Sequence, residues 1–464
     1  MKKLLTLLLL PFTVITSMSA CQTVRASDSY NDPVSDTAPR YDAQNLHTLE
    51  FPYFTAGTPL EPCDIGHGNT LFVYTNTDEA AYADYCALLV KGGYEKKYDN
   101  TITDNRFAAF SGEDRTLYAY YIPSQQSVRI VDDPTSDGLA VFTEERKGDK
   151  VTDNHVAQLI MNYSWQDFGM CYIFTLEDGR FVIIDGGYDA GKDFSGYVHD
   201  LIYNYLNEHN LRSDGIHIAA WILTHDHPDH YNAIHGFAEK YGSEVAVERF
   251  LMNLRKDSDY ERNVWEADRS AFGADMLVQY LHTGEKFSFC GIEFEVLYTQ
   301  EDLYPVDPEG DINETSIVLR STAEGQSFLW CSDIEERACG VICPMYGSYL
   351  QSEVCQIAHH GYLEHAATTE FYDLADPSVI LWPHSIGCMQ AWSSSAVNQH
   401  LLNEQNVKEV LIADRTIKVL PLPYQGEFTC LSIPFRPNMP TTPVVKDEKQ
   451  DPSVIHYSRN SHNG

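Results

Sequence analysis

The chain is short of basic residues, and this shortage excludes a large class of partners. Its 464 residues include 32 Lys and Arg against 67 Asp and Glu, which gives a net charge of −35. A protein that follows a nucleic-acid backbone needs a basic face. We therefore expect no extended interface with nucleic acid.

Long apolar runs are also missing beyond the N-terminus, so no later segment is expected to span a bilayer. Residues 1–21 have the pattern of a secretory signal peptide, with Lys2-Lys3 followed by the apolar run Leu4–Leu10. The ending Met18-Ser19-Ala20-Cys21 resembles a bacterial lipobox, in which the cysteine is lipidated. We expect an extracytoplasmic lipoprotein held at the membrane through Cys21, or a secreted protein if cleavage is simple. Residues 22–45 are polar and are expected to be a tether.

The cysteines form no recognisable framework. There are 11 of them at irregular spacing, and no Cys-x-x-Cys pair occurs. Cys339 and Cys343 lie four apart, but no matching second pair follows. Most are therefore expected to be buried free thiols.

The remaining sequence is long enough for two domains. Residues 46–146 alternate strand patterns with one helix at 78–89, which predicts a small α+β domain with no cluster of catalytic residue types. Residues 155–436 contain strands that alternate with helices, among them a helix expected at 260–281. Residues 437–464 contain mainly polar residues and proline, and we expect a disordered tail.

The densest group of reactive residue types is Thr-His-Asp-His-Pro-Asp-His at 224–230. An apolar strand pattern precedes it, and a helical pattern follows it. His225 and His227 are two apart on an extended segment, so they point to one side. Asp229 and His230 follow the proline and open the helix in new directions. One short segment can thus offer ligands to two neighbouring metal ions, and imidazole with carboxylate suits zinc and similar metals.

Three further apolar strands end in residues of ligand type. They are Phe181–Asp185, which is followed by Gly186-Gly187; Phe328–Asp333; and Val354–His360, which ends in His-His and is followed by Gly361. Strand ends form the rim of a layered sheet. The sequence therefore predicts that these residues meet at one edge.

In this order the four segments resemble the metallo-β-lactamase fold, an αββα sandwich with a two-metal site along its edge. The resemblance covers residues 155–436 and implies a hydrolase with two zinc ions, or manganese. The pattern Asn-x-x-Ser, strand, Ser-Asp and His-His-Gly is similar to two sub-branches. These are the hydrolase domains of DNA-uptake competence proteins and the phosphorylcholine esterase of bacterial surfaces.

The resemblance implies a role for each strand-end residue. The first metal would be held by His225 and His227, the second by Asp229 and His230, and both by Asp333, with a last histidine from His359 or His360, a choice the sequence leaves open. Asp185 would orient the ligands through hydrogen bonds, and Asp229 would also orient the nucleophile. The alternative for Asp333 is the N-cap of a helix.

One departure from the family pattern concerns the first metal. Most members carry another histidine before the bridging aspartate, but residues 284–332 contain none. Asn313 stands at the corresponding place, and its amide is a poor zinc ligand. We expect Asn313 to donate its amide to the substrate instead. His384, after the strand pattern 379–381, is expected to reach the rim and contact a phosphate.

The most consistent function is hydrolysis of a phosphodiester or small phosphoryl ester by a metal-activated hydroxide. The substrate would be a small ester or a surface polymer. One alternative is a β-lactam or lactone hydrolase. The other is a non-catalytic lipoprotein whose small domain binds a surface polymer.

Overall fold

A computed structural model describes residues 51–134, 138–160, 169–189, 198–304, 311–362, 366–404, 406–432 and 451–457. The expected signal peptide with Cys21, the tether and most of the expected tail lie outside these residues. The described residues all belong to one compact unit. Within the described part, no helix combines the length and the apolar character needed to cross a membrane.

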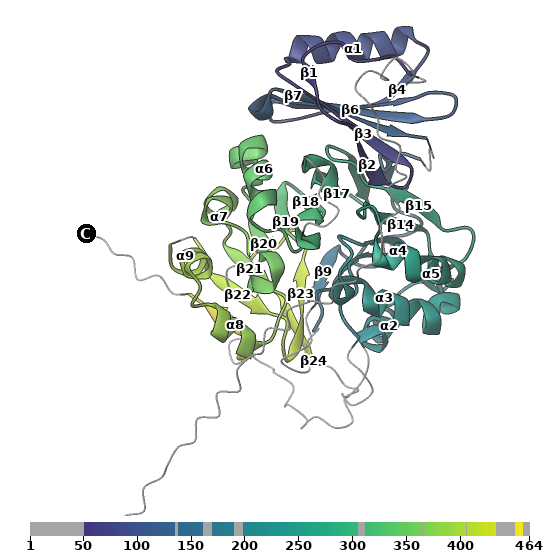
Figure 1. Ribbon diagram of the computed structural model, residues 1–464. Helices are drawn as coiled ribbons and strands as arrows, with labels where there is room; N and C mark the ends of the chain where they lie inside the picture. The colour runs from purple at the N-terminus through teal and green to yellow at the C-terminus, as the bar shows by residue number, and fades with distance from the viewer. Residues whose placement is uncertain are drawn as a thin grey trace, which may run out of the picture. The chain divides into compact units, whose positions relative to one another are not determined.

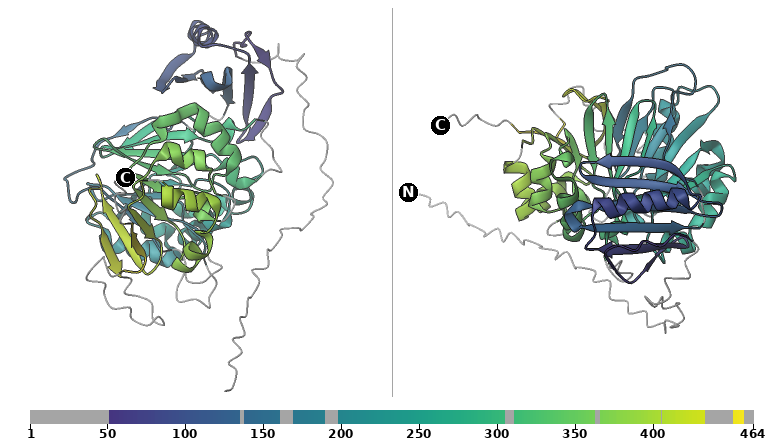
Figure 2. Two further views of the ribbon diagram at one scale, coloured as in Figure 1. Left: turned by 90° about the vertical axis from the view of Figure 1, so that its left-hand side faces the viewer. Right: turned by 90° about the horizontal axis from the view of Figure 1, so that it is seen from above.

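The first part of the described chain folds into a seven-stranded sheet in the order β1-β3-β7-β6-β5-β4, with β2 beside β3. Helix α1 lies across one face of it (Figure 2) and begins where Asp78 accepts a hydrogen bond from the Ala81 N–H. The buried ring of Tyr85 and the side chain of Leu89 hold the helix on the sheet. The elements are β1 (Thr58–Pro59), β2 (Cys63–Gly66), β3 (Asn69–Thr75), α1 (Glu79–Lys91), β4 (Glu95–Ile102), β5 (Asn105–Ser111), β6 (Thr116–Ile122) and β7 (Ser127–Asp133).

A nine-stranded sheet follows, in the order β15-β14-β12-β11-β10-β9-β23-β24, with β13 beside β12. Strands β11, β12, β14 and β15 are parallel, so their carboxyl ends meet at one edge. The strands are β9 (His155–Gln158), β10 (Tyr172–Thr175), β11 (Phe181–Ile184), β12 (Ile216–Ile222), β13 (Val245–Val247), β14 (Arg249–Met252), β15 (Leu277–Tyr280), β23 (Thr416–Pro421) and β24 (Thr429–Ser432).

A second nine-stranded sheet has the order β25-β22-β21-β20-β19-β18-β17-β16-β8. Its strands β19, β20, β21 and β22 are parallel to one another. The strands are β8 (Thr143–Glu144), β16 (Lys286–Phe289), β17 (Ile292–Tyr298), β18 (Val318–Ala323), β19 (Gln326–Trp330), β20 (Val354–Gln356), β21 (Val379–Trp382), β22 (Glu409–Ile412) and β25 (Val454–His456).

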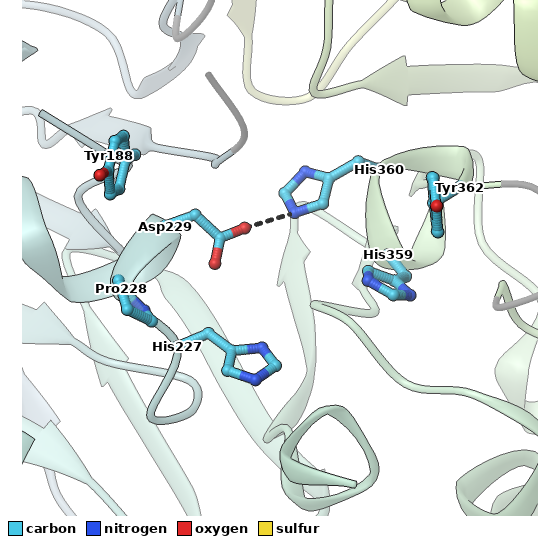
Figure 3. A pocket seen from close by; sticks show the side chains of 7 residues that line it. All are labelled: Tyr188, His227, Pro228, Asp229, His359, His360 and Tyr362. Carbon is cyan, nitrogen blue, oxygen red and sulfur yellow. Dashed lines mark ion pairs between the residues drawn. The ribbon is translucent and has the colours of Figure 1, made fainter. Parts of the chain in front are cut away.

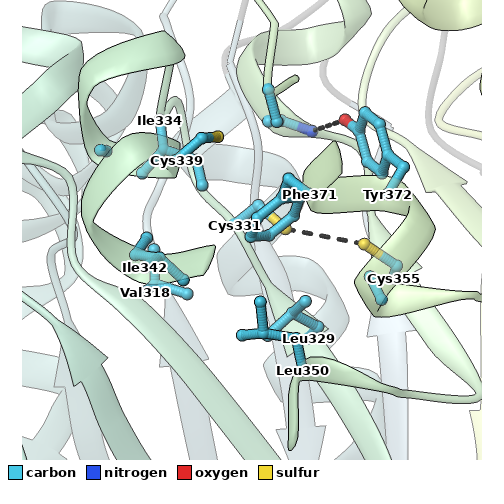
Figure 4. Packing of buried hydrophobic residues seen from close by; sticks show 14 of the residues in the cluster. Val318, Leu329, Cys331, Ile334, Cys339, Ile342, Leu350, Cys355, Phe371 and Tyr372 are labelled. Atoms are coloured by element: carbon cyan, nitrogen blue, oxygen red, sulfur yellow. Dashed lines mark hydrogen bonds between the residues drawn. The ribbon is translucent and has the colours of Figure 1, made fainter. Parts of the chain in front are cut away.

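Helices cover the outer face of each of these two sheets (Figure 1). The first sheet carries α2 (Val198–His209), α3 (Pro228–Tyr241), α4 (Asp259–Asn263) and α5 (Trp265–Phe272), and the second carries α6 (Glu336–Tyr346), α7 (Thr369–Ala375), α8 (Ile386–Trp392) and α9 (Ala396–Glu404). Separate apolar cores fill the three gaps between the layers. Figure 4 shows the core under α6 and α7, where Phe371 packs beside Cys331 and Cys355. The predicted αββα sandwich is confirmed.

Two predictions about single elements are wrong. The helix expected at 260–281 ends at Phe272, where Gly273 takes a positive φ of 106°, and the chain then forms β15. The expected disordered tail includes β25, which pairs with β22. The buried Lys418 ammonium holds the start of that strand by donating a hydrogen bond to Ser453 Oγ (2.6 Å). Polar composition alone did not indicate this anchor.

Candidate active site

The histidine segment lies where β12 ends and α3 begins, at the carboxyl edge of the first sheet. Its helix is seated close to the end of β11, because the Gly186 N–H donates to the His230 carbonyl (2.8 Å). A side chain at Gly186 would meet Ile234 at 2.6 Å, so only glycine permits this approach. The predicted Asp-Gly-Gly turn therefore fixes the helix that carries Asp229 and His230.

The second sheet supplies its residues from the ends of β19 and β20. Ser332, His359 and His360 all adopt left-handed backbone conformations, with φ of 49°, 45° and 55°. Such conformations are rare for residues with a side chain and often occur at functional sites. Here they turn Asp333 and both histidines toward the first sheet.

Four side chains converge to form what we call the primary group: Asp229, His230, Asp333 and His360. Their ligand atoms all lie within 4.8 Å of one another. Asp333 Oδ2 is 3.1 Å from the Nε2 atoms of both His230 and His360, and Asp229 Oδ2 is 3.2 Å from His360 Nε2. Asp333 caps no helix, since the N-cap of α6 is Glu335. The N-cap alternative is therefore wrong.

Charges in the primary group are strongly coupled. Burial alone would raise the pKa of Asp333, but the charges of His360 and His230 hold it well below its usual range. Burial lowers the pKa of His360, but Asp333 and Asp229 outweigh burial and raise it to about 9. The group is therefore an anion-rich pocket that holds positive charge, whether protons or a metal cation.

Asp185 orients the primary group through a hydrogen bond to His230, as the sequence predicted. Its Oδ2 lies 2.8 Å from His230 Nδ1, and the same carboxylate accepts hydrogen bonds from the Thr224 N–H and hydroxyl, both 2.8 Å. Holding Nδ1 in this way turns Nε2 of His230 toward Asp333. A carboxylate behind a histidine is the usual arrangement in metal sites.

His225 and His227 lie beside the primary group. The Nε2 atom of His225 is 3.9 Å from Asp333 Oδ2, and its Nδ1 lies 3.1 Å from the Thr224 hydroxyl. Burial, together with the charge of His230, holds the pKa of His225 well below its usual range, so the ring is neutral. His227 is half-buried and lines the adjoining pocket.

The structure separates the two histidines between which the sequence could not decide. His360 belongs to the primary group, whereas His359 Nε2 is 4.0 Å from Asp333 Oδ2. His359 Nδ1 lies 3.1 Å from Glu335 Oε1, and its Nε2 lies 3.3 Å from the amide nitrogen of Asn313. That amide nitrogen also donates to Glu335 Oε1 (2.9 Å). Asn313 thus directs its N–H groups to protein atoms, and the structure gives no support to the predicted hydrogen bond to the substrate.

The prediction that His384 reaches the rim is wrong. Its side chain is fully buried, and its Nδ1 accepts a hydrogen bond from the Ser385 N–H (2.7 Å). Its ring stands edge-on to His360 and to Trp392, with centroids 6.3 and 4.7 Å away. His384 follows Pro383, whose carbonyl lies 3.3 Å from His360 Nδ1. Burial, with the charge of His360, lowers the pKa of His384 to about 3.

A pocket of about 410 Å³ opens beside the primary group (Figure 3). Asp229 and His360 point toward each other in it, with His227 and His359 nearby. Seven described residues line it: Tyr188, His227, Pro228, Asp229, His359, His360 and Tyr362. Sequence reasoning missed the two tyrosines and Glu335. Only Glu335 gave a signal, because it lies two residues after Asp333 in Ser-Asp-Ile-Glu.

The primary group and its neighbours fit a divalent cation. Nε2 of His225 and Oδ1 of Asp333 are buried and have no hydrogen-bond partner among the described residues. Leaving such atoms unpaired is costly unless an ion or water occupies the site. Imidazole and carboxylate are the ligands that zinc, manganese and iron share. The residues therefore match a metal centre, without fixing which metal it takes.

Residues 165–311 match the family model described as the Metallo-beta-lactamase superfamily. The match begins before β10 and ends before Asn313, so it includes the whole histidine segment. Among curated proteins, no significant match to the chain was found.

The comparison with solved structures gave matches of low identity and low TM-score. The metallo-beta-lactamase fold protein YhfI from Bacillus subtilis is 13% identical, with 60% of this chain and 100% of that chain covered at a TM-score of 0.38. The diiron beta-hydroxylase CmlA from Streptomyces venezuelae is 11% identical, and the match covers 62% of this chain and 55% of that chain with a TM-score of 0.36. Zn(2+)-bound PqqB from Methylobacterium extorquens is 14% identical, and the match covers 44% of this chain and 71% of that chain with a TM-score of 0.28.

The family match covers the segment that supplies Asp229 and His230, and the layers around it form the predicted sandwich. Residues 165–311 of this chain are therefore similar in sequence to the metallo-beta-lactamase superfamily.

Proposed function

We propose that the protein is an extracytoplasmic, metal-dependent hydrolase of phosphodiesters or small phosphoryl esters. The observation that carries the proposal is the primary group, which opens into a pocket of about 410 Å³. A pocket of this size accepts a small molecule. Asp229, His230, Asp333 and His360 would hold one divalent ion, and His225 and His227 would contribute to a second. Zinc or manganese suits these donors best.

Bound divalent ions would supply Lewis acidity and a nucleophile at neutral pH. The residues of the chain prepare the site for that chemistry. Asp229 lines the pocket, and its low pKa, set by His230 and His360 against the effect of burial, keeps it ionised. It can therefore accept a hydrogen bond from the attacking water and fix its direction.

The choice of a small ester over a long polyanion rests on charge. None of the seven described lining residues is Lys or Arg, and the whole chain carries a net charge of −35. A nucleic-acid backbone would be repelled by such a surface. A single phosphoryl group needs only the local field of the metal site.

A panel of chromogenic esters tests the proposal. We expect the metal-loaded protein to hydrolyse bis-nitrophenyl phosphate or nitrophenyl phosphorylcholine, and nitrocefin at most weakly. Preferential hydrolysis of nitrocefin would favour the alternative hypothesis of a β-lactam or lactone hydrolase. Efficient cleavage of plasmid DNA at low salt would point instead to the competence-type branch.

The location outside the cytoplasm rests on the first 21 residues, which precede the described part. In cells, Cys21→Ser should move the protein from the membrane fraction to the medium or leave it unprocessed. Unchanged membrane retention of this variant would reject the lipid anchor.

A further inference from the structure

The metal-binding residues fall into two sets that differ in how tightly they converge. In the primary group every ligand atom lies within 4.8 Å of the others, and Asp333 contacts both of its histidines at 3.1 Å. Both rings are held from behind, His230 by Asp185 (2.8 Å) and His360 by the Pro383 carbonyl (3.3 Å). Four preoriented donors are enough to hold a zinc-like ion.

The other set, which we call the secondary group, consists of His225, His227, His359 and Asn313. Nε2 of His225 and of His359 lie 3.9 and 4.0 Å from Asp333 Oδ2. Across the described part of the chain, the primary group is the single set of at least three His, Cys, Asp or Glu side chains with ligand atoms within 4.8 Å. The secondary group therefore lies beside the carboxylate of Asp333, but its ligand atoms do not converge as those of the primary group do.

Contacts of Asn313 and Glu335 explain why the ligand atoms of the secondary group do not converge. Its amide nitrogen lies 3.3 Å from His359 Nε2 and donates to Glu335 Oε1 (2.9 Å). Glu335 also lies 3.1 Å from His359 Nδ1. Both nitrogens of the His359 ring thus have close protein neighbours, and the amide of Asn313 is itself a poor ligand for zinc. His225, His227 and the shared carboxylate remain as donors.

We propose that the two metal positions are unequal: the primary group holds one ion tightly, and the secondary group holds a second ion weakly because Asn313 and Glu335 engage His359. This inference rests on the proposed metal-dependent function and refines it. It makes the second ion exchangeable, so the amount of fully loaded protein would follow the supply of metal outside the cell.

Metal titration of the full-length protein tests the inference without measuring catalysis. Protein stripped with a chelator is titrated with Co²⁺, and binding is followed by calorimetry and by the visible absorption of the bound ion. We expect one ion to bind at least about tenfold more tightly than the second, the scale of effects seen when groups that support a metal site are lost. Two equally tight ions would overturn the inference and leave the proposed function standing. Absence of any binding would overturn the proposed function itself.

Variants then identify the residues. Asn313→His adds an imidazole and removes the amide, so we expect the second ion to bind about tenfold more tightly while the first is unchanged. The matched control is Glu324→His in the exposed turn between β18 and β19, which should alter neither ion. An unchanged second ion in a folded Asn313→His variant would reject the role of Asn313. His227→Ala tests the same division in another way, because loss of the half-buried imidazole should weaken binding of the second ion only. Loss of the first ion in that variant would contradict the division into two groups.

Discussion

Two groups of buried histidine and carboxylate side chains occur in the described part of this protein, and they differ in what surrounds them. The primary group lies beside a pocket of about 410 Å³. The other consists of His282, Glu285, Glu301 and Asp302, and we call it the junction group. It lies next to the seven-stranded sheet, where the His282 ring stacks on Tyr118 with centroids 3.6 Å apart. The cavity beside it is about 10 Å³, room for at most one water.

Hydrogen bonds link the side chains of the junction group to one another and to their neighbours. His282 Nδ1 pairs with Glu301 Oε1 at 2.5 Å, and Asp302 accepts a hydrogen bond from the Thr283 hydroxyl (2.6 Å). Glu285 accepts one from the His282 N–H (2.8 Å). These bonds tie the turn before β16 to the turn after β17, and the small cavity leaves no space for a substrate.

Both groups nevertheless contain strongly shifted pKa values. Burial raises the pKa of Glu285 to about 7, and it would lower that of His282, which Glu301 and Glu285 instead raise to about 9. A perturbed pKa is therefore not enough to locate an active site. Convergence of ligand atoms next to an open pocket distinguishes the primary group.

The largest expected effect comes from breaking the primary group. Asp333→Asn keeps the shape of the side chain but removes the charge that both His230 and His360 contact. Loss of an outer residue of a metal site typically costs about 10–100-fold in affinity or activity, and a direct ligand should cost more than about 100-fold. Ester hydrolysis and metal content, measured on the same sample, check this. Near-normal values for both would show that Asp333 is not a ligand.

A smaller effect is expected one layer further out. Asp185→Asn should weaken the bond that orients His230 and lower activity by about 10–100-fold, with the fold retained. Added metal should restore part of this loss, because the ligands themselves are intact. The comparison is between metal-dependence curves of the variant and the wild type, and identical curves would remove Asp185 from the site.

The junction group should influence stability and leave catalysis unchanged. Because the folded-state pKa of Glu285 is about 7 against an ordinary value of 4.5, the wild type loses stability as pH rises through this window. The side chain introduced in the Glu285→Gln variant cannot ionise, so the variant does not lose this stability. We expect the difference in free energy of unfolding, variant minus wild type, to be larger at pH 8 than at pH 5 by on the order of 1–3 kcal/mol. Denaturant unfolding at the two pH values measures the change.

Glu324→Gln serves as the control for that experiment, since Glu324 is exposed in a turn. It should show no pH-dependent difference from the wild type. If Glu285→Gln also shows none, the junction carboxyl is not held protonated by burial. If Glu285→Gln loses hydrolytic activity while folded, the contrast between the two groups fails.

The sequence predicted those parts of the site that depend on where apolar strands end. The segment 224–230 and Asp333 follow such strands, and the parallel strands bring their ends together. The choice between His359 and His360 was not predictable, because it depends on two left-handed residues and on hydrogen bonds to Glu335 and Asn313. The depth of His384 was missed for a similar reason. A residue directly after a buried strand can turn inward, and here it packs behind His360.

The fold shows the same division. Apolar runs predicted the hairpins and the helix–strand units of the sandwich. Long-range pairings were not visible, among them β23 with β9 and β25 with β22. Such pairings join segments far apart in the chain, and the contacts that hold β25, among them those of the buried Lys418 and of Asp451, are not revealed by composition.

The central claim is that this protein hydrolyses esters with metal held by the primary group. The most direct test measures metal content and bis-nitrophenyl phosphate hydrolysis together, before chelation, after chelation and after metal is restored. We predict at least one divalent ion per chain after mild purification, loss of activity with its removal, and recovery on addition of zinc or manganese. Protein that is metal-free when purified and binds neither metal would contradict the claim.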